Sequence, residues 1–209
     1  MRPSRLRLPT LLLIVFASTL LVACDEDVLG TGERGSGNLV TESRDVADFD
    51  SIDVGSALDL DVIVDPNAAQ SVNVTFDDNI IAMVVTRVSG NTLVLDIDGS
   101  VNLTGGADRM IAVTMKQLVA LDASGASNVK VTGSATALSL DTSGASSVDL
   151  RDLTVTDVEL DVSGASSVEV AAGGVVSGSV SGASSLDVYG DPSSVEVDSS
   201  GASSIDIRN

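Results

Sequence analysis

The second half of the chain repeats itself, and this constrains the fold more than any other feature. The string Ser-Gly-Ala-Ser occurs five times, with its glycine at positions 125, 144, 164, 182 and 201, so that the spacings are 19, 20, 18 and 19 residues. A period of about 20 residues is typical of a solenoid, in which each short repeat buries its apolar face only by stacking on its neighbours. Glycine suits the tight corner of a coil because it adopts backbone angles that other residues avoid.

The residues around each glycine fall into columns when the repeats are aligned. The positions four and six residues after it are always branched aliphatic: Val129, Val148, Val168, Leu186 and Ile205, then Val131, Leu150, Val170, Val188 and Ile207. Such alternation predicts strands with one buried and one exposed face. We therefore expect the aliphatic columns inside the stack and the serines at one corner, where their hydroxyls would hydrogen-bond along the stack.

Residues 39–120 alternate with the same period but lack the repeated string, and turn residues such as Pro66-Asn67 and Gly90-Asn91 separate their apolar runs. The sequence therefore predicts an all-β fold whose C-terminal half is a solenoid with coils of about 19 residues. The alternative is a β-sandwich in which the even spacing of the loops is a coincidence.

Residues 1–23 have the layout of a secretory lipoprotein signal peptide. Arginines precede an apolar run from Leu8 to Leu20, and Leu-Val-Ala leads directly into Cys24, the only cysteine. This last string resembles the bacterial lipobox, which implies cleavage before Cys24 and a diacylglycerol on its sulfur that anchors the chain in a membrane. The alternative is an ordinary cleaved signal with a cysteine nearby by chance.

The segment 24–38 is rich in glycine and acidic residues, which predicts a flexible linker before a single domain at residues 39–209. Cleavage leaves 8 Lys+Arg against 30 Asp+Glu, a net charge of −22. This charge argues against binding to nucleic acid and repels an anionic bilayer. We therefore expect the exported chain to bind the membrane through lipidated Cys24, at the outer membrane or on the periplasmic face of the cell envelope.

Three features resemble the family of bacterial envelope proteins with the "putative auto-transporter adhesin, head GIN" domain. They are Val46–Val54 as an opening strand, Gly90–Leu95 in the middle, and the serial Ser-Gly-Ala-Ser-Ser-Val-Asp pattern; together they cover about residues 45–209. The resemblance implies a right-handed parallel β-helix-like fold behind a lipoprotein signal. It also implies an adhesin. We expect a binding scaffold, with a glycan or an envelope or surface protein as its ligand. The resemblance carries over no catalytic residue.

Two columns of carboxylates are the candidate metal ligands. The first lies between the aliphatic columns, where Lys130 is followed by Asp149, Glu169, Asp187 and Asp206. The second lies three residues before the glycine and contains Asp122, Asp141 and Asp161. Like charges about 5 Å apart repel, and Ca²⁺, which binds several oxygen ligands, would relieve the repulsion. The functional interpretation is a Ca²⁺ ladder on the first column, and the alternative is a solvated face that prevents edge pairing.

The composition excludes several catalytic mechanisms. The chain has no histidine, so it lacks an imidazole base, and one cysteine cannot form an internal disulfide or a Cys₄ zinc site. Paired carboxylates leave a polysaccharide-acting β-helix enzyme as the least favoured alternative. We predict a scaffold with no catalytic activity, and the first alternative is a periplasmic structural or envelope-stress component.

The last aliphatic pair, Ile205 and Ile207, precedes only Arg208 and Asn209 in this sequence. Solenoid ends need a cap, because an uncapped coil exposes its edge. We therefore predict a weak homodimer through the C-terminal edge.

Overall fold

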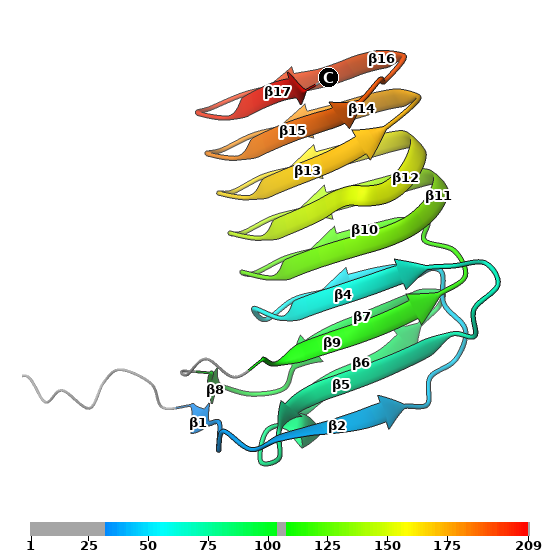
Figure 1. Cartoon of the computed structure of the whole chain (residues 1–209). Helices are drawn as coiled ribbons and strands as arrows, with labels where there is room; N and C mark the ends of the chain where they lie inside the picture. Colours follow the sequence, from blue (N-terminus) through cyan, green and yellow to red (C-terminus); the bar gives the residue numbers. More distant parts are fainter. Residues whose placement is uncertain (1–31, 104–107, 209) are drawn as a thin grey trace, which may run out of the picture. The chain divides into compact units, whose positions relative to one another are not determined.

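The computed structural model describes residues 32–103 and 108–208, and Figure 1 shows the arrangement of their strands. The signal peptide, Cys24 and the first part of the predicted linker lie outside these residues. The described residues include no α-helix, and none of their helical segments is long and apolar enough to cross a membrane. Fifteen strands form one sheet, and β1 (Glu33–Arg34) and β8 (Val101–Asn102) form a separate pair. The prediction of an all-β fold is confirmed.

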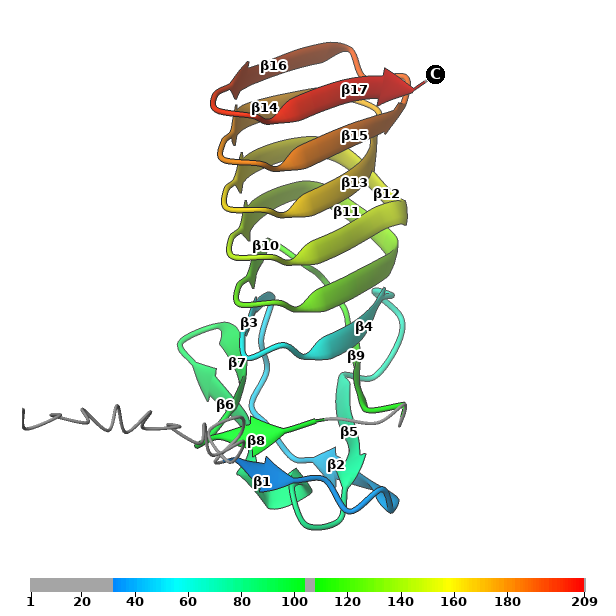
Figure 2. The ribbon, with the colours of Figure 1, turned by 90° about the vertical axis from the view of Figure 1, so that its left-hand side faces the viewer.

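Two rows of parallel strands run along the stack, and we call them row A and row B (Figure 2). Row A contains, in spatial order, β7 (Thr92–Ile97), β3 (Ser51–Val54), β10 (Ala120–Ala123), the C-terminal halves of β11 (Asn128–Thr142) and β12 (Ser147–Val162), β14 (Val175–Val180) and β16 (Ser194–Ser199). Row B contains β9 (Met110–Met115), β4 (Asp59–Val64), the N-terminal halves of β11 and β12, β13 (Ser167–Ala172), β15 (Ser185–Gly190) and β17 (Ser204–Arg208). Each Ser-Gly-Ala-Ser string joins a row A strand to the following row B strand.

The repeats stack in the register that their aligned columns predict. Val129 pairs with Val148, Val148 with Val168, and the same column continues through Leu186 to Ile205. The first four of these side chains are buried between the rows, where the core consists almost entirely of Val, Leu and Ile. Burial of each such side chain stabilises the fold by about 1.5–3 kcal/mol, so the stacking of the coils supplies the core that a single coil lacks.

Two features of the backbone account for the glycines of the repeated corners. All five have φ between +74° and +78°, in the left-handed region. In addition, the amide after Gly164, that of Ala165, donates a hydrogen bond of 2.8 Å to the carbonyl of Gly144 in the preceding coil. A Cβ on Gly164 would lie 2.3 Å from that carbonyl oxygen. The corners from Gly144 onward therefore stack backbone on backbone with no room for a side chain, whereas at Gly125 a Cβ would lie 3.3 Å from the amide nitrogen of Ser56.

The corner serines bond differently from the predicted ladder along the stack. The second serine of each string is buried in the first four repeats, and its hydroxyl bonds mainly within its own turn. Ser127, Ser146 and Ser166 donate to the carbonyl three residues earlier at 2.9–3.0 Å. A serine hydroxyl readily reaches such a nearby carbonyl, and this competes with bonds between coils. The prediction holds only in part, for example where the amide of Ser166 donates a 3.2 Å hydrogen bond to the hydroxyl of Ser184 in the next coil.

A sixth corner, which the repeated string does not predict, lies in the first half of the chain. Residues 55–58 connect β3 to β4 and occupy the place of a Ser-Gly-Ala-Ser string, because β3 pairs with β10 and β4 with β11. Ser56 and Ala57 adopt φ values of +57° and +56° there, although neither is glycine. Leu58 takes the position of the buried serine and is itself fully buried. The flanking alternation of Ile52, Val54, Leu60 and Val62 was the available signal.

The stacking order of the first half does not follow the sequence. β3 lies between β7 and β10, and β4 lies between β9 and β11, although β7 and β9 come later in the chain. Antiparallel strands close this end of the stack. β5 (Ser71–Asp77) pairs with β9 and with β2 (Leu39–Arg44), while β6 (Val84–Ser89), which follows a short 3₁₀ helix at Ile81–Met83, pairs with β7. The other end, at β16 and β17, has no such cover among the described residues (Figure 1).

Part of the segment predicted as a linker is attached to the domain. Glu33 and Arg34 form β1 and pair with β8, and the amide of Gly37 donates a 2.6 Å hydrogen bond to the carboxylate of Asp77. Asp77 is fully buried, and Arg109, which is 8% exposed, forms an ion pair with it. Composition alone suggested flexibility here, because it does not reveal the buried acceptor that orders this segment.

Candidate functional site

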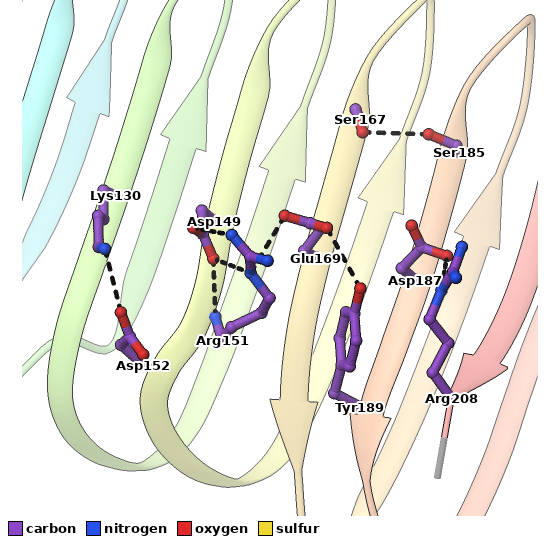
Figure 3. A network of polar contacts seen from close by, with 10 residues as sticks. All are labelled: Lys130, Asp149, Arg151, Asp152, Ser167, Glu169, Ser185, Asp187, Tyr189 and Arg208. Carbon is purple, nitrogen blue, oxygen red and sulfur yellow. Dashed lines mark hydrogen bonds and ion pairs between the residues drawn. The ribbon is translucent and has the colours of Figure 1, made fainter.

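The predicted carboxylate column lies on the outer face of row B, shown in Figure 3. Asp149, Glu169, Asp187 and Asp206 project from β12, β13, β15 and β17, and each is the registered neighbour of the next. Neighbouring strands lie about 4.8 Å apart, so the backbone alone brings these side chains together. Lys130 occupies the same column on β11, opposite Asp149.

Basic side chains bind these carboxylates. The aligned columns did not predict these contacts, because the basic residues stand one position further along the exposed face. The guanidinium of Arg151 donates to both carboxylate oxygens of Asp149, at 2.9 and 2.7 Å, and its Nε lies 3.2 Å from Glu169 Oε2. Arg208 Nε lies 2.8 Å from Asp187 Oδ1. These ion pairs relieve the repulsion for which Ca²⁺ was invoked. In residues 32–103 and 108–208, no three His, Cys, Asp or Glu side chains are grouped to hold a metal ion.

The ion pairs favour the charged forms of Asp149, Lys130 and Arg208. Hydrogen bonds from Arg151 hold the pKa of Asp149 below its ordinary value, and hydrogen bonding to Asp187 raises the pKa of Arg208. Lys130, whose Nζ lies 3.0 Å from Asp152 Oδ2, likewise has a raised pKa. Exposed pairs of this kind stabilise a fold by only about 0–1 kcal/mol. These pairs therefore matter less for stability than for binding, because they place charged donors and acceptors side by side on the surface.

The only tyrosine of the chain lies on the same face. The hydroxyl of Tyr189 donates a 3.3 Å hydrogen bond to Glu169 Oε1, next to the carboxylate oxygen that Arg151 contacts. Tyrosine and arginine are enriched in binding surfaces, because each combines a flat contact area with polar groups. The outer face of row B thus places an aromatic ring and guanidinium groups on a regular sheet. We call the residues labelled in Figure 3 the polar strip of row B; they are Lys130, Asp149, Arg151, Asp152, Ser167, Glu169, Ser185, Asp187, Tyr189 and Arg208.

The outer face of row A differs, because its carboxylates carry no ion pair among the described residues. Asp53, Asp122, Asp141 and Asp161 are registered neighbours on four consecutive strands. Three of them were predicted as a column; Asp53 was missed because it precedes the sixth corner. Partial burial and the charges of Asp53 and Asp141 raise the pKa of Asp122. We call these four residues the aspartate column of row A. Their carboxylates repel one another without the compensating cations that the polar strip of row B contains.

We expect Asp122→Asn to stabilise the fold at neutral pH. Because the folded state raises the pKa of Asp122, its ionisation costs stability, which is lost as the pH rises through the folded-state pKa. Removing like charges from opposite positions on neighbouring strands is worth about 0.2–1 kcal/mol. The gain in unfolding free energy, measured by urea denaturation, should shrink in 1 M salt, where the Debye length is about 3 Å. It should also vanish below about pH 3, where aspartate is protonated in both states.

Asp191→Asn, at an exposed position outside the strands, is the matched control, and we expect it to change stability by less than about 0.5 kcal/mol. A loss of stability in Asp122→Asn, or a gain that is independent of salt and pH, would contradict the repulsion in the aspartate column.

One surface hollow has a volume of about 560 Å³ and lies away from both carboxylate columns. It adjoins the turns that lead from row B to row A, and Lys116, Val119, Thr136, Thr154 and Thr156 are among the residues that line it. None of its lining residues is a carboxylate, a histidine or a cysteine. Its polar side chains are the hydroxyl groups of serine and threonine, the amide of Gln117 and the amine of Lys116.

Comparisons with solved structures agree on the fold. A putative adhesin from Bacteroides fragilis NCTC 9343 matches with a TM-score of 0.53 and 20% identity over 85% of this chain and 100% of that chain. A putative adhesin from Parabacteroides distasonis ATCC 8503 matches with a TM-score of 0.52 and 17% identity, again over 85% of this chain and 100% of that chain. At these identities the likeness shows the fold alone. No curated protein matches the chain.

A family model gives the more specific result. The model described as "Putative auto-transporter adhesin, head GIN domain" matches residues 48–133 and 101–192. These matches include the sixth corner, the antiparallel strands β5 and β6, and four of the five Ser-Gly-Ala-Ser strings. Because they cover well over half of its residues, the chain belongs to the putative auto-transporter adhesin, head GIN domain family.

Proposed function

We propose that this protein is a lipid-anchored, non-catalytic binding protein of the bacterial cell envelope, and that the polar strip of row B binds its ligand, a glycan or an envelope or surface protein. The distribution of charge carries the proposal. Among the repeats, every lysine and arginine lies in the polar strip, namely Lys130, Arg151 and Arg208, together with the only tyrosine. The aspartate column of row A has no such cations.

The geometry of the strip suits an extended ligand. It runs over β11, β12, β13, β15 and β17, and successive strands are about 4.8 Å apart, so it is about 19 Å long. Guanidinium groups bind carboxylates with two parallel hydrogen bonds, and a tyrosine ring offers a flat apolar contact. We further propose that the coils wind as a right-handed parallel β-helix-like solenoid, because crossover connections between parallel strands are right-handed in about 98% of cases.

The envelope location rests on the family description and on the sequence. An adhesin family supports a protein of the cell surface or envelope, and two structural neighbours are themselves described as putative adhesins. The lipid anchor rests on the string that ends at Cys24, which lies outside the described residues.

The absence of catalysis is proposed on chemical grounds. Glycoside hydrolysis needs one carboxyl group that stays protonated near neutral pH beside a second, ionised one. Asp149 and Glu169 are neighbours on adjacent strands and are therefore the candidate pair for this reaction. Both contact Arg151, however, which lowers the pKa of Asp149. The chain also lacks a histidine that would activate a serine nucleophile.

Location is tested by adding protease to intact cells. We expect the domain to be cleaved from unbroken cells, and a chain with Cys24→Ala to be lost from the membrane fraction. If the domain is protected until the outer envelope is opened, binding to external surfaces is contradicted, and a periplasmic structural or envelope-stress role takes its place.

Binding is tested with purified residues 25–209 on arrays of glycans and of surface proteins. For the ligand that binds, Arg151→Gln combined with Tyr189→Ala should weaken the affinity at least about tenfold, which corresponds to about 1.4 kcal/mol. Arg87→Gln is the matched control, because Arg87 is an exposed arginine on β6, outside the strip. Equal losses in both variants, or release of new sugar ends from a polysaccharide, would contradict the proposal.

A further inference from the structure

Among the described residues, the outermost coil, formed by β16 and β17, exposes its outer strand edges and part of its apolar interior. In the described part of the chain, β16 pairs only with β14, and β17 only with β15. Ile207 occupies the inward position that Val188 has in the coil below, yet Ile207 is 54% exposed and Val188 is fully buried. Val195, Val197 and Ile205 of the same coil are only partly buried. Free edges of this kind pair readily with another strand.

We propose that this edge binds the same edge of a second copy of the chain, so that two molecules associate end to end through β17. Identical edges related by a two-fold axis across the strands must pair antiparallel, which satisfies the free backbone groups of both strands. An antiparallel pairing centred on Ile207 covers this side chain and sets Asp206 opposite Arg208 of the other copy. The proposal does not rest on the proposed ligand, because it concerns the isolated chain.

The charges on the two edge strands favour β17 over β16 as the contact. β16 carries Glu196 and Asp198 and no basic residue, so two β16 edges would repel. β17 carries both Asp206 and Arg208, and like charges need not face each other there. At the opposite end of the stack β2 and β6 also have free edges, but the apolar interior is covered there, since Phe76 and Ile80 are buried (Figure 1).

The association should be weak and should depend on salt. β17 has five residues and β16 has six, so the strands are about 17–20 Å long, and stacked sheets lie about 10 Å apart. An end face of this size buries less than the area of about 1,200 Å² at which stable interfaces begin. The net charge of −22 on residues 25–209 opposes contact between copies at low ionic strength. We therefore expect a dissociation constant of roughly 10 µM to 1 mM that falls as salt is added.

Sedimentation of residues 25–209 tests the proposal. The described strands and their core all belong to one compact unit, residues 31–209, so this form keeps every contact described above. We expect a monomer–dimer equilibrium in the wild-type chain and a monomer in Ile207→Lys. Ile63→Lys is the matched control: Ile63 is 52% exposed, but it lies on β4, which has β9 and β11 on its two sides. This variant should dimerise like the wild type.

Disulfide trapping tests the register. Residues 25–209 contain no cysteine, so a single introduced thiol reports only on contacts between copies. Opposed residues of antiparallel strands have Cα atoms about 4.5–5.5 Å apart, within the range of a disulfide. Ile207→Cys should form covalent dimers on oxidation, and Ile63→Cys should not. A wild-type chain that stays monomeric up to about 1 mM, an Ile207→Lys variant that still dimerises, or equal trapping at both positions would overturn the proposal.

Discussion

Gly164→Ala is expected to lower the free energy of unfolding by about 2–5 kcal/mol. The left-handed backbone at φ +78° costs a residue with a Cβ about 1–2 kcal/mol. The new Cβ would also lie 2.3 Å from the carbonyl oxygen of Gly144, and such overpacking costs about 1–3 kcal/mol. No rotamer change relieves this clash, because the backbone of one coil fixes the position of the Cβ and the oxygen belongs to the backbone of the preceding coil. Urea denaturation followed by circular dichroism measures the loss.

Alanine substitutions at two further glycines test whether the loss of stability follows the severity of the clash. At Gly201, in the last corner, a Cβ would lie 2.7 Å from the carbonyl oxygen of Gly182, so Gly201→Ala should cost less and remain measurable if Gly164→Ala fails to fold. At Gly173 a Cβ would meet no atom within 4 Å, and we expect Gly173→Ala to change stability by less than about 1 kcal/mol. Equal losses at Gly164 and Gly173 would show that the corners do not limit the stack.

Asp77→Asn is expected to cost about 3–5 kcal/mol, because it breaks a buried ion pair by removing the charge of one partner. Asp77 is fully buried, and its carboxylate accepts hydrogen bonds from Arg109 and from the amide of Gly37. The substitution should also loosen the segment that this carboxylate holds. We therefore expect faster cleavage by trypsin after Arg34, together with a lower midpoint of urea denaturation.

The effect of pH on this pair follows from the direction of the shift. The hydrogen bond from Arg109 is the main cause that holds the pKa of Asp77 below its ordinary value. The stability from this pair is therefore present above about pH 4, the pKa of an unfolded aspartate, and is lost as the pH falls through the folded-state pKa. Asp77→Asn should remove this part of the acid sensitivity.

Asp149→Asn is the matched control for Asp77→Asn, since Asp149 also pairs with an arginine but on the exposed polar strip of row B. It should cost only about 0–1 kcal/mol. Similar losses in the two variants would contradict the importance that burial gives to the Asp77–Arg109 pair.

The sequence predicted which carboxylates share a column, but not which side chains contact them. The carboxylates Asp149, Glu169 and Asp187 share a column because the period of the repeat places them at the same point of each coil. Their partners were not predicted, because a long arginine side chain can reach several neighbours, and only the folded chain selects among them. The sequence suggested a cation between the carboxylates, whereas the structure has Arg151 and Arg208 there.

A gap in one column shows a similar limit. The repeat places Gly178 where the other coils have Leu140, Leu160 and Val197, which makes a leucine seem acceptable at this position. In the structure Gly178 has φ +131°, and a Cβ would lie 1.8 Å from the carbonyl oxygen of Leu160. Alignment of columns identifies which residues face inward, but the local backbone decides which of them has room for a side chain.

By itself the sequence determined the all-β fold, the coils from residue 120 onward, their register and their glycine corners. Those contacts join consecutive repeats, so the same short pattern specifies each of them. Only the tertiary structure decided that β3 and β4 lie between strands that follow them in the chain, and that Asp77 holds residues near Gly37. The physical reason is that an alternating strand without a repeat fits many partners equally well. Long-range packing around the shared core then selects one arrangement.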